Sequence, residues 1–213
     1  MNLQKKDFIE IKFTGRIKDG EVFDSNIKED LENLNSNANT NPLIFCLGEN
    51  MFLKGIDEFL VDKKIGEYKI ELSPEKAFGN RDSNLIQMIP LKVFKEQKVN
   101  PVPGAIFNFD GKIAKILTAS GGRVMVDFNN PLAGKTVVYD IKVLRRIEDL
   151  NEKVKALIDF FTRKEFKFEI KDKKLLIYAD KQFAQFLNLF KDKFKDILDL
   201  ELEVKEVEIK NKK

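Results

Sequence analysis

The sequence predicts an α+β protein with three parts: a discontinuous first domain at 1–84 and 126–148, an insert at 85–125, and a C-terminal domain at 149–213. Three observations support this division. Strand-like alternation opens the chain, short runs broken by Pro and Gly interrupt it in the middle, and helical spacing of apolar residues marks the end. With 213 residues the chain is long enough for two or three cores.

Composition narrows the possible functions. Apolar residues make up 43% and charged residues 34%, which is typical of a globular protein. The net charge of +3 is spread along the chain without a basic stripe, so we expect no nucleic-acid partner. The absence of His removes the commonest transition-metal ligand and the usual general base. We therefore expect neither a metal nor a cofactor.

The N-terminus and the single cysteine indicate a compartment. Met1 to Asp7 leads directly into a strand pattern without an apolar signal region, and no stretch reaches 18 apolar residues. Cys46 excludes an intramolecular disulfide, which fits a reducing environment. We expect a cytoplasmic protein that does not enter a membrane.

The first domain is predicted to begin with a β-hairpin, because residues 8–13 alternate and Asp19-Gly20 can form the turn before Val22-Phe23. The Asn-rich segment 26–41 predicts a long loop with one helical turn near 29–34. A strand at 43–47, a helix within 51–61 and a strand at 68–72 follow.

The insert is predicted to be a small all-β domain, with strand-like runs at 105–109 and 113–117. Strand texture resumes at 124–128, and the run 136–144 predicts a long strand that closes the first sheet.

The C-terminal domain is predicted to have the order αββαβ. Asp149 with Glu152 three residues later indicates a helix start. Alternation then predicts two paired strands, and a Phe-rich stripe predicts one helix over 181–198 before a last strand. This helix could bury its stripe internally or against a second copy, so dimerisation and additional client binding both stay open.

Motifs in the first domain resemble the signature of the FKBP peptidyl-prolyl cis-trans isomerases. They are Phe13-Thr14-Gly15, Asp19-Gly20, Val22-Phe23-Asp24-Ser25, Pro42-Leu43, Leu47-Gly48, Gly55 and the run Pro74 to Gly79. The resemblance continues through Gly121 to Val124 and Val126 to Lys135 as far as Tyr139, and covers about 7–148. It is strongest to the SlyD-like class and its long archaeal members.

The resemblance implies an FKBP-like antiparallel half-barrel wrapped on a short helix, with an insert in the flap that acts as a chaperone. It also implies rotation about X-Pro bonds of unfolded or partly folded polypeptides. The residue-by-residue match gives a candidate catalytic pocket of Phe13, Phe23, Asp24, Leu43, Phe45, Phe52, Leu53, Ile56, Phe78, Leu132 and Tyr139.

The chemistry of this reaction needs no nucleophile. The uncatalysed barrier is about 18–20 kcal/mol because resonance stiffens the C–N bond. A 10⁵-fold acceleration would lower it by roughly 7 kcal/mol, which a dry apolar pocket holding a twisted amide could supply. Within that pocket Asp24 could act on the amide electrostatically or orient the covering loop, and we favour orientation.

Three positions depart from the family pattern. Phe13 and Phe78 stand where Tyr is usual, and Asn130 replaces a His. Loss of the Phe78 hydroxyl would remove a hydrogen bond to the substrate, so we expect modest activity on short peptides.

The insert also carries a candidate client-binding surface, because a 40-residue unit cannot bury all its apolar residues. Its residues are Ile86, Met88, Ile89, Leu91, Val93 and Phe94. Two alternatives to an isomerase remain: a holdase chaperone or binding module with little catalysis, and an assembly scaffold that uses the C-terminal domain.

Overall fold

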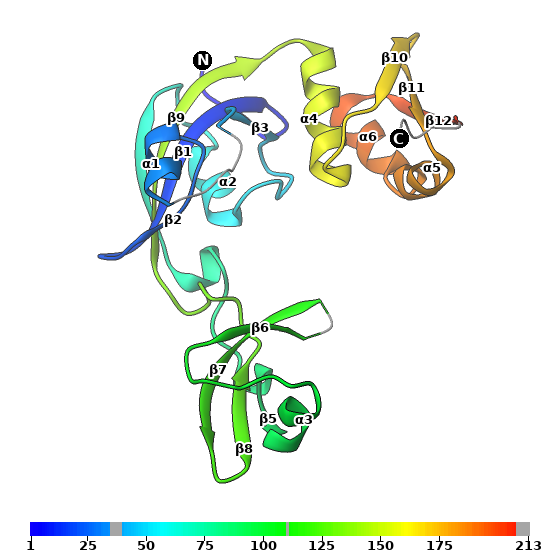
Figure 1. Ribbon diagram of the computed structural model, residues 1–213. Coiled ribbons are helices and arrows are strands. Elements are labelled where there is room, and N and C mark those ends of the chain that lie inside the picture. The colour runs from blue at the N-terminus through cyan, green and yellow to red at the C-terminus, as the bar shows by residue number, and fades with distance from the viewer. Residues whose placement is uncertain (35–39, 110, 208–213) are drawn as a thin grey trace. The chain divides into compact units, whose positions relative to one another are not determined.

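The computed structural model describes residues 1–34, 40–109 and 111–207 (Figure 1). The chain divides into two compact units. The first unit comprises Met1–Arg16, Glu21–Ile70 and Val138–Lys213, and the second comprises Ile17–Gly20 and Glu71–Val137. The predicted insert at 85–125 therefore lies within a larger second unit, and the predicted C-terminal domain shares its unit with the first sheet.

The first sheet has five strands, with the order β2-β1-β9-β4 and β3 paired to β1. Its strands are β1 (Phe8–Ile17), β2 (Val22–Ser25), β3 (Leu43–Cys46), β4 (Glu67–Leu72) and β9 (Val137–Ile147). The predicted hairpin is present as antiparallel β1 and β2, and β3 also pairs antiparallel with β1. The mixed α+β class with antiparallel sheets is confirmed.

Two helices accompany this sheet. Helix α1 (Lys28–Asn33) is the helical turn expected in the Asn-rich segment, whose residues 35–39 lie outside the described part. Helix α2 (Lys54–Leu60) lies against the sheet in Figure 1 and buries Ile56 and Leu60 completely. Ile9 and Ile11 of β1 are completely buried as well.

The second unit contains an antiparallel sheet with the order β5-β8-β7-β6. Its elements are the short 3-10 helices η1 (Pro74–Lys76) and η2 (Ser83–Leu85), then β5 (Ile86–Pro90), α3 (Leu91–Glu96), β6 (Ile106–Phe109), β7 (Lys112–Ser120) and β8 (Arg123–Asp127). The prediction of an all-β insert is wrong in one respect, because α3 is helical. Pro90 ends β5, and Phe94 then packs on the sheet from one turn of helix.

The C-terminal segment forms a three-stranded sheet, β10-β11-β12, in which β11 and β12 run parallel. Its elements are α4 (Leu150–Thr162), β10 (Lys167–Lys171), β11 (Lys174–Ala179), α5 (Lys181–Asn188), α6 (Lys191–Leu198) and β12 (Glu201–Glu206). The single helix expected at 181–198 is two helices, because the chain turns at Leu189 and Phe190. Residues 208–213 lie outside the described part.

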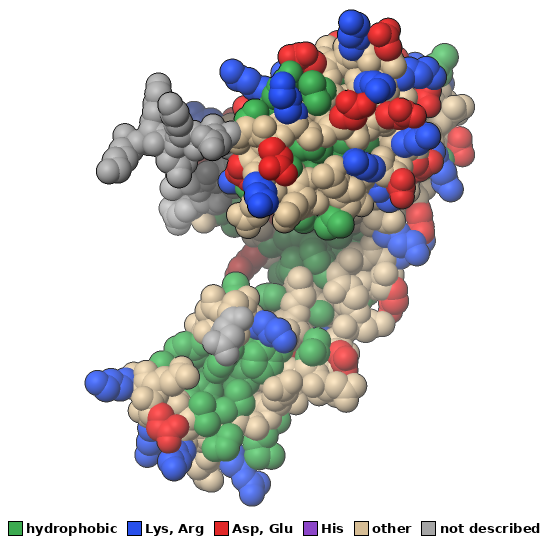
Figure 2. All heavy atoms as spheres, turned by 90° about the vertical axis from the view of Figure 1, so that its right-hand side faces the viewer, with side chains coloured by type: hydrophobic (Ala, Val, Ile, Leu, Met, Phe, Trp, Pro, Cys, Tyr) green, Lys and Arg blue, Asp and Glu red, His purple; other side chains and the backbone are tan. Residues whose placement is uncertain are grey.

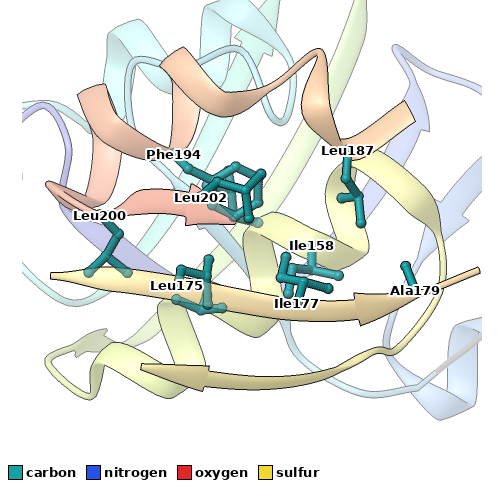
Figure 3. Packing of buried hydrophobic residues seen from close by; sticks show 10 residues of the cluster. Ile158, Leu175, Ile177, Ala179, Leu187, Phe194, Leu200 and Leu202 are labelled. Carbon is teal, nitrogen blue, oxygen red and sulfur yellow. The ribbon is translucent and has the colours of Figure 1, made fainter. Parts of the chain in front are cut away.

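Helices α4, α5 and α6 cover this sheet with a continuous apolar core (Figure 3). Leu175 and Ile177 on β11 face Ile158, Leu187 and Phe194 from the three helices. The Phe-rich stripe is therefore buried internally in large part. Asp149 begins α4 as predicted, since its Oδ1 accepts a 2.8 Å hydrogen bond from the Glu152 amide.

Helices α4 and α6 also pack on the first sheet. Phe8, Cys46 and Ile147 are buried together, and Ala156 of α4 and Ile197 and Leu198 of α6 pack against them. This contact joins the two sheets of the first unit.

Candidate active site

Aromatic rings gather around Tyr139 on one side of the first sheet. The ring centroids of Phe13, Phe23 and Phe52 lie 6.0, 5.8 and 5.7 Å from that of Tyr139. Phe13 and Phe52 are 5.0 Å apart, and Phe45 lies 5.6 Å from Phe52. These separations are those of attractive tilted and edge-to-face pairs. We call Phe13, Phe23, Phe45, Phe52 and Tyr139 the ring cluster.

Strand geometry explains why residues far apart in sequence meet here. Ile9 and Ile11 of β1 lie opposite Phe45 and Leu43 of β3. Because side chains alternate along a strand, Phe13, Leu43 and Phe45 lie on the same face of the sheet. Phe45 is 1% exposed and Leu43 is half-buried, so the face is apolar and becomes more accessible toward Leu43.

The start of α2 supplies the other predicted pocket residues. Leu53 is the N-cap of α2, and its carbonyl accepts hydrogen bonds from the amides of Ile56 and Asp57 at 2.9 and 3.1 Å. Phe52 and Leu53 are half-buried, whereas Ile56 is completely buried. Ile56 can therefore form a floor, and Phe52 and Leu53 remain accessible.

Gly15 is a site residue that the predicted list omitted. A Cβ at this position would lie 2.8 and 2.9 Å from Tyr139 Cε1 and Cζ and 3.1 Å from Phe23 Cζ. Real Cβ atoms do not approach other atoms so closely, so only glycine lets these two rings sit above β1. The motif Phe13-Thr14-Gly15 was used only as part of the family resemblance. That Gly15 is needed because a side chain would not fit there was not predicted.

Asp24 provides the one carboxylate among the predicted pocket residues. It lies opposite Gly15 in the β1–β2 pair. Although Asp24 is solvent-exposed, partial desolvation by its surroundings raises the pKa of its carboxyl, while a hydrogen bond from the Ser25 amide opposes this. Burial, and then the Asp24 charge, raise the pKa of Tyr139, so the phenol stays protonated at any physiological pH. The site thus presents one anion, Asp24, beside apolar rings among which the Tyr139 phenol is buried.

Buried polar groups fix the segment that follows Asp24. The Asn26 Oδ1 accepts from the Phe13 amide at 2.8 Å, and its Nδ2 donates to the Ile11 carbonyl at 3.1 Å. The Ser25 hydroxyl lies 2.9 Å from the Phe13 carbonyl oxygen and 3.0 Å from Asp30 Oδ2. Sequence reasoning missed Asn26, because it stands in an Asn-rich run that is typical of a solvated loop.

Phe78 and Leu132 belong to the second unit and are both half-buried there. Phe78 follows η1, and the Leu132 amide donates to Asn130 Oδ1 at 2.8 Å. The Gly134 amide donates to the Gly79 carbonyl at 2.8 Å, so the segments that carry Phe78 and Leu132 are joined.

A buried polar network holds the same two segments together closer to the insert. Asp127 Oδ1 accepts from the amide and the Nδ2 of Asn129 at 2.9 and 2.7 Å. Asn129 also exchanges two hydrogen bonds with the backbone of Asp82, at 2.8 and 2.9 Å. Arg81 pairs with Asp127, whose pKa is lowered by its hydrogen bonds with Asn129 and by the Arg81 charge against the opposing effect of burial.

The predicted client-binding residues of the insert differ in their exposure to solvent. Met88 and Val93 are 55% and 41% exposed, and Ile86 is half-buried. Ile89 and Leu91 are partly buried against the insert core. The prediction for Phe94 is wrong, because this side chain is 3% exposed at the centre of that core.

Other apolar residues of the insert are more exposed, and the prediction omitted them. Ile106 and Ile113 are each 63% exposed, and Val102 is 52% exposed. A surface pocket of about 640 Å³ is lined by Leu85, Gln87, Phe109, Lys112, Ile113, Phe128 and Asn130. Figure 2 shows apolar side chains gathered over one face of the insert. Strand alternation could have identified Ile113 as exposed. Ile113 and Ile116 are three residues apart on β7 and therefore point to opposite faces of the sheet.

The chemical character of the site is apolar and aromatic. Within 1–34, 40–109 and 111–207, acidic and sulfur-bearing side chains form no group of three suited to a metal ion. Over the same residues, every helix is too short or too polar to cross a membrane. The accessible part of the site consists of the half-buried Phe23, Leu43, Phe52 and Leu53, on which an apolar ring of a ligand can pack, with the Asp24 carboxylate at the border.

Comparison with known proteins yields one matching family model and several relatives. The model of the FKBP26 IF domain matches residues 87–132. The short-type peptidyl-prolyl cis-trans isomerase of Methanocaldococcus jannaschii is 32% identical over 148 residues, which cover 67% of this chain and 94% of that protein. The FKBP-type isomerase SlyD of Helicobacter pylori is 35% identical over 127 residues, 58% and 69% of the two chains. The FKBP-type 16 kDa isomerase of Escherichia coli is 32% identical over 149 residues, 67% and 93%.

Proposed function

The chain belongs to the FKBP-type peptidyl-prolyl cis-trans isomerases, and from this membership we propose that it accelerates proline-limited folding of polypeptides captured by its insert. The observation that carries the proposal is the ring cluster around Tyr139, with Gly15 leaving the space that its rings need. Its substrates are unfolded or partly folded chains that contain X-Pro bonds.

The ring cluster supports catalysis by transfer of the prolyl amide from water to an apolar enclosure. Water stabilises the planar amide through its polar resonance form, and a dry aromatic surface removes that stabilisation. The twisted amide has a smaller dipole than the planar amide, so the same surface raises its free energy less. The barrier to rotation therefore falls. In this proposal the proline ring packs against the accessible side of Phe52, above a floor formed by the completely buried Ile56.

Asp24 contributes mainly by orientation in this proposal. Ser25 and Asn26, directly after it, hydrogen-bond to β1 on the other side of the hairpin, so the carboxylate is held at a fixed place. The raised pKa of Asp24 reflects partial desolvation, which strengthens its effect on a neighbouring dipole.

The insert captures clients through apolar side chains that its small core leaves in water. Its exposed large apolar residues are Leu85, Met88, Val93, Val102, Ile106 and Ile113. Together they form an apolar surface that can contact clients of different sequence. A captured chain then presents its prolines to the ring cluster at a higher local concentration.

A holdase with little catalysis is the alternative. Phe78 carries no hydroxyl where the family usually has Tyr, and the exposed apolar surface of the insert would suffice to suppress aggregation without isomerisation.

Refolding of a protein whose slow step is prolyl isomerisation separates the two functions. We would compare the wild type, Asp24→Ala and a variant in which a short Gly-containing turn replaces 86–126. The Phe128 amide donates to the Leu85 carbonyl at 2.9 Å, so the two ends are adjacent and the turn can close them.

Acceleration by the wild type that the deletion abolishes, with short-peptide turnover retained, would support an isomerase supplied by its insert. Suppression of aggregation without acceleration by any variant would replace the proposal with a holdase.

We also propose a cytoplasmic setting, supported by the one free and buried cysteine, Cys46. A homodimer through 149–213 stays a prediction. The stripe that suggested it is largely internal, although Leu189 and Phe186 are 77% and 38% exposed. Sedimentation equilibrium would test it.

A further inference from the structure

The segment Leu47–Leu53, which we call the site loop, joins β3 to α2 and carries Phe52 and Leu53. It has no regular secondary structure, and Gly48 and Asn50 adopt positive φ angles of 83° and 54°. Helix α2 begins at the end of the loop without a side-chain cap. The position of Phe52 and Leu53 therefore depends on contacts that the loop makes elsewhere.

One set of contacts comes from the catalytic half of the first unit. Asp57 of α2 is 4% exposed, and its Oδ2 accepts a 3.0 Å hydrogen bond from the Asn50 amide. The Leu47 amide donates to the Asp7 carbonyl, and the Lys6 amide donates to the Leu47 carbonyl, both at 2.9 Å. These bonds fix the beginning and the middle of the site loop.

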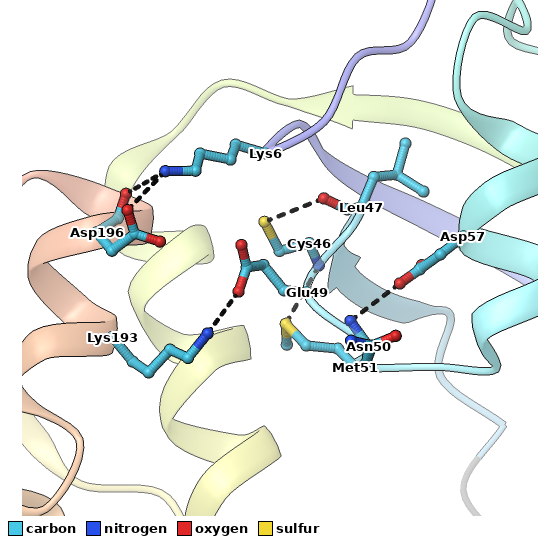
Figure 4. A network of polar contacts seen from close by, with 9 residues as sticks. All are labelled: Lys6, Cys46, Leu47, Glu49, Asn50, Met51, Asp57, Lys193 and Asp196. Atoms are coloured by element: carbon cyan, nitrogen blue, oxygen red, sulfur yellow. Dashed lines mark hydrogen bonds and ion pairs between the residues drawn. The ribbon is translucent and has the colours of Figure 1, made fainter.

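The other set comes from the C-terminal segment (Figure 4). Lys193 of α6 points toward the site loop, and its Nζ lies 3.0 Å from Glu49 Oε2. Met51, two residues later, packs against both the core of the C-terminal segment and the cluster of Phe8, Cys46 and Ile147. A second ion pair of 2.8 Å joins Lys6 to Asp196 on the same helix.

The Glu49–Lys193 pair differs from the other ion pairs on this surface. The Glu49 side chain is 13% exposed, whereas the carboxylates that pair with Lys173, Lys174 and Lys195 are 54% or more exposed. A largely desolvated carboxylate loses much more than an exposed one when its cation is removed. Burial is the main cause that raises the pKa of Asp57, and the nearby Glu49 charge acts in the same direction, against hydrogen bonds from the amides of Asn50 and Gly48.

We propose that α6 is a positioning element of the active site, in which Lys193 acts through Glu49 to hold the site loop and thereby place Phe52 and Leu53. This inference rests on the proposed function, because it assigns those two residues to substrate binding. It gives the C-terminal segment a role in catalysis without direct contact with the substrate.

The test uses the full-length protein and an X-Pro tetrapeptide, with kcat and KM measured separately. Lys193→Ala should lower kcat/KM by about three- to tenfold, because small displacements of positioning groups carry such costs. The loss should appear chiefly in KM, since the loop presents binding residues. Lys195→Ala is the matched control, because Lys195 lies on the same helix and pairs with Glu201 outside the site loop.

The charge exchange Glu49→Lys with Lys193→Glu separates positioning from general stability. Each single reversal should lower kcat/KM, and the double variant should recover most of the loss. The melting temperature of each variant is measured in parallel, and the expected loss of kcat/KM exceeds anything that partial unfolding at the assay temperature explains.

Wild-type kcat and KM values in Lys193→Ala, or single reversals that the double variant does not rescue, would overturn the positioning role and leave the isomerase proposal standing. Absence of turnover by the wild type would instead overturn the proposed function itself.

Discussion

The first sheet and the insert both gather apolar side chains, but they use them in opposite ways. In the first unit, Phe13, Phe45 and Tyr139 are buried and form ring pairs with fixed geometry. In the insert, Ile106 and Ile113 are each 63% exposed without such a partner set. In the proposed function, the first arrangement selects a ligand by shape and serves catalysis, whereas the second binds many chains weakly and serves capture.

The difference has a physical cause in the size of each core. The first sheet is accompanied by α2, and its residues Phe8, Cys46 and Ile147 pack on α4 and α6 of the C-terminal segment, so more than one element covers its apolar side chains. The insert has one short sheet and one six-residue helix, whose core is Phe94, Ala114, Ile116, Val124 and Val126. A unit of this size cannot bury all of its apolar surface.

The largest effect should follow from disturbing the ring cluster at Gly15. A Gly15→Ala Cβ would lie within 2.9 Å of two Tyr139 ring atoms, so the ring must move. We expect kcat/KM on an X-Pro peptide to fall by about 10²-fold. Gly66→Ala is the control, because its Cβ would meet nothing closer than 3.8 Å. Equal activity of both variants would contradict the space requirement.

Two isoleucines on β7 allow a buried and an exposed apolar side chain of the insert to be compared directly. Ile116 is completely buried, so Ile116→Ala should lower the unfolding free energy of the insert by about 2–5 kcal/mol. Ile113→Ser should change it by less than about 0.5 kcal/mol. Ile113→Ser should nevertheless weaken suppression of client aggregation, measured by light scattering. Unchanged suppression would remove Ile113 from the capture surface.

A pH titration of stability tests the buried carboxyl beneath the site loop. Burial raises the pKa of Asp57 to about 6 from its ordinary 3.8. The folded state then binds the proton more tightly than the unfolded state, so this group lowers the unfolding free energy as pH rises from about 4 to about 6.

The variant Asp57→Asn has no titrating carboxyl at this position, so it lacks this pH-dependent decrease in unfolding free energy. Its stability relative to the wild type should increase across the same pH interval by roughly 2 kcal/mol, since one pKa unit corresponds to about 1.4 kcal/mol. Urea unfolding at pH 4, 5, 6 and 7 measures this difference. Parallel curves for the two proteins would show that Asp57 does not titrate in this range.

The smallest effect is expected from restoring a hydroxyl at Phe78. Phe78→Tyr should raise kcat/KM by about fivefold at most, because one neutral hydrogen bond contributes on the order of 1 kcal/mol. Phe23→Tyr provides a comparison at another ring of the same protein. An unchanged value for Phe78→Tyr would show that the family hydroxyl has no role here.

Much of the fold could be predicted because its signals are local. Alternation over 8–13 identified β1, the run of strand-favouring residues at 136–144 identified β9, and Asp149 identified the start of α4. Elements whose form depends on packing were missed or merged. Helix α3 follows a proline and has six residues, too few for a periodic pattern, and the separation of α5 from α6 rests on a turn around Phe190.

The site shows the same division. The residues of the ring cluster could be named from motifs, whereas Asn26 and Glu49 could not, because each resembles an ordinary solvated loop residue in the sequence. Phe94 was assigned to the wrong environment, since the sequence shows that it is apolar but not which face of α3 is covered.

The sequence by itself determined most strands of the first sheet and the start of α4, because these follow from local side-chain patterns. The family resemblance named Phe13, Phe23, Phe45, Phe52 and Tyr139, whose rings the structure brings together. Only the tertiary structure decided that Gly15 must remain without a side chain, that the Phe-rich stripe turns inward, and that α6 reaches the site loop. Each of these depends on contacts between residues distant in sequence, and no local pattern specifies which of several apolar or charged partners will meet.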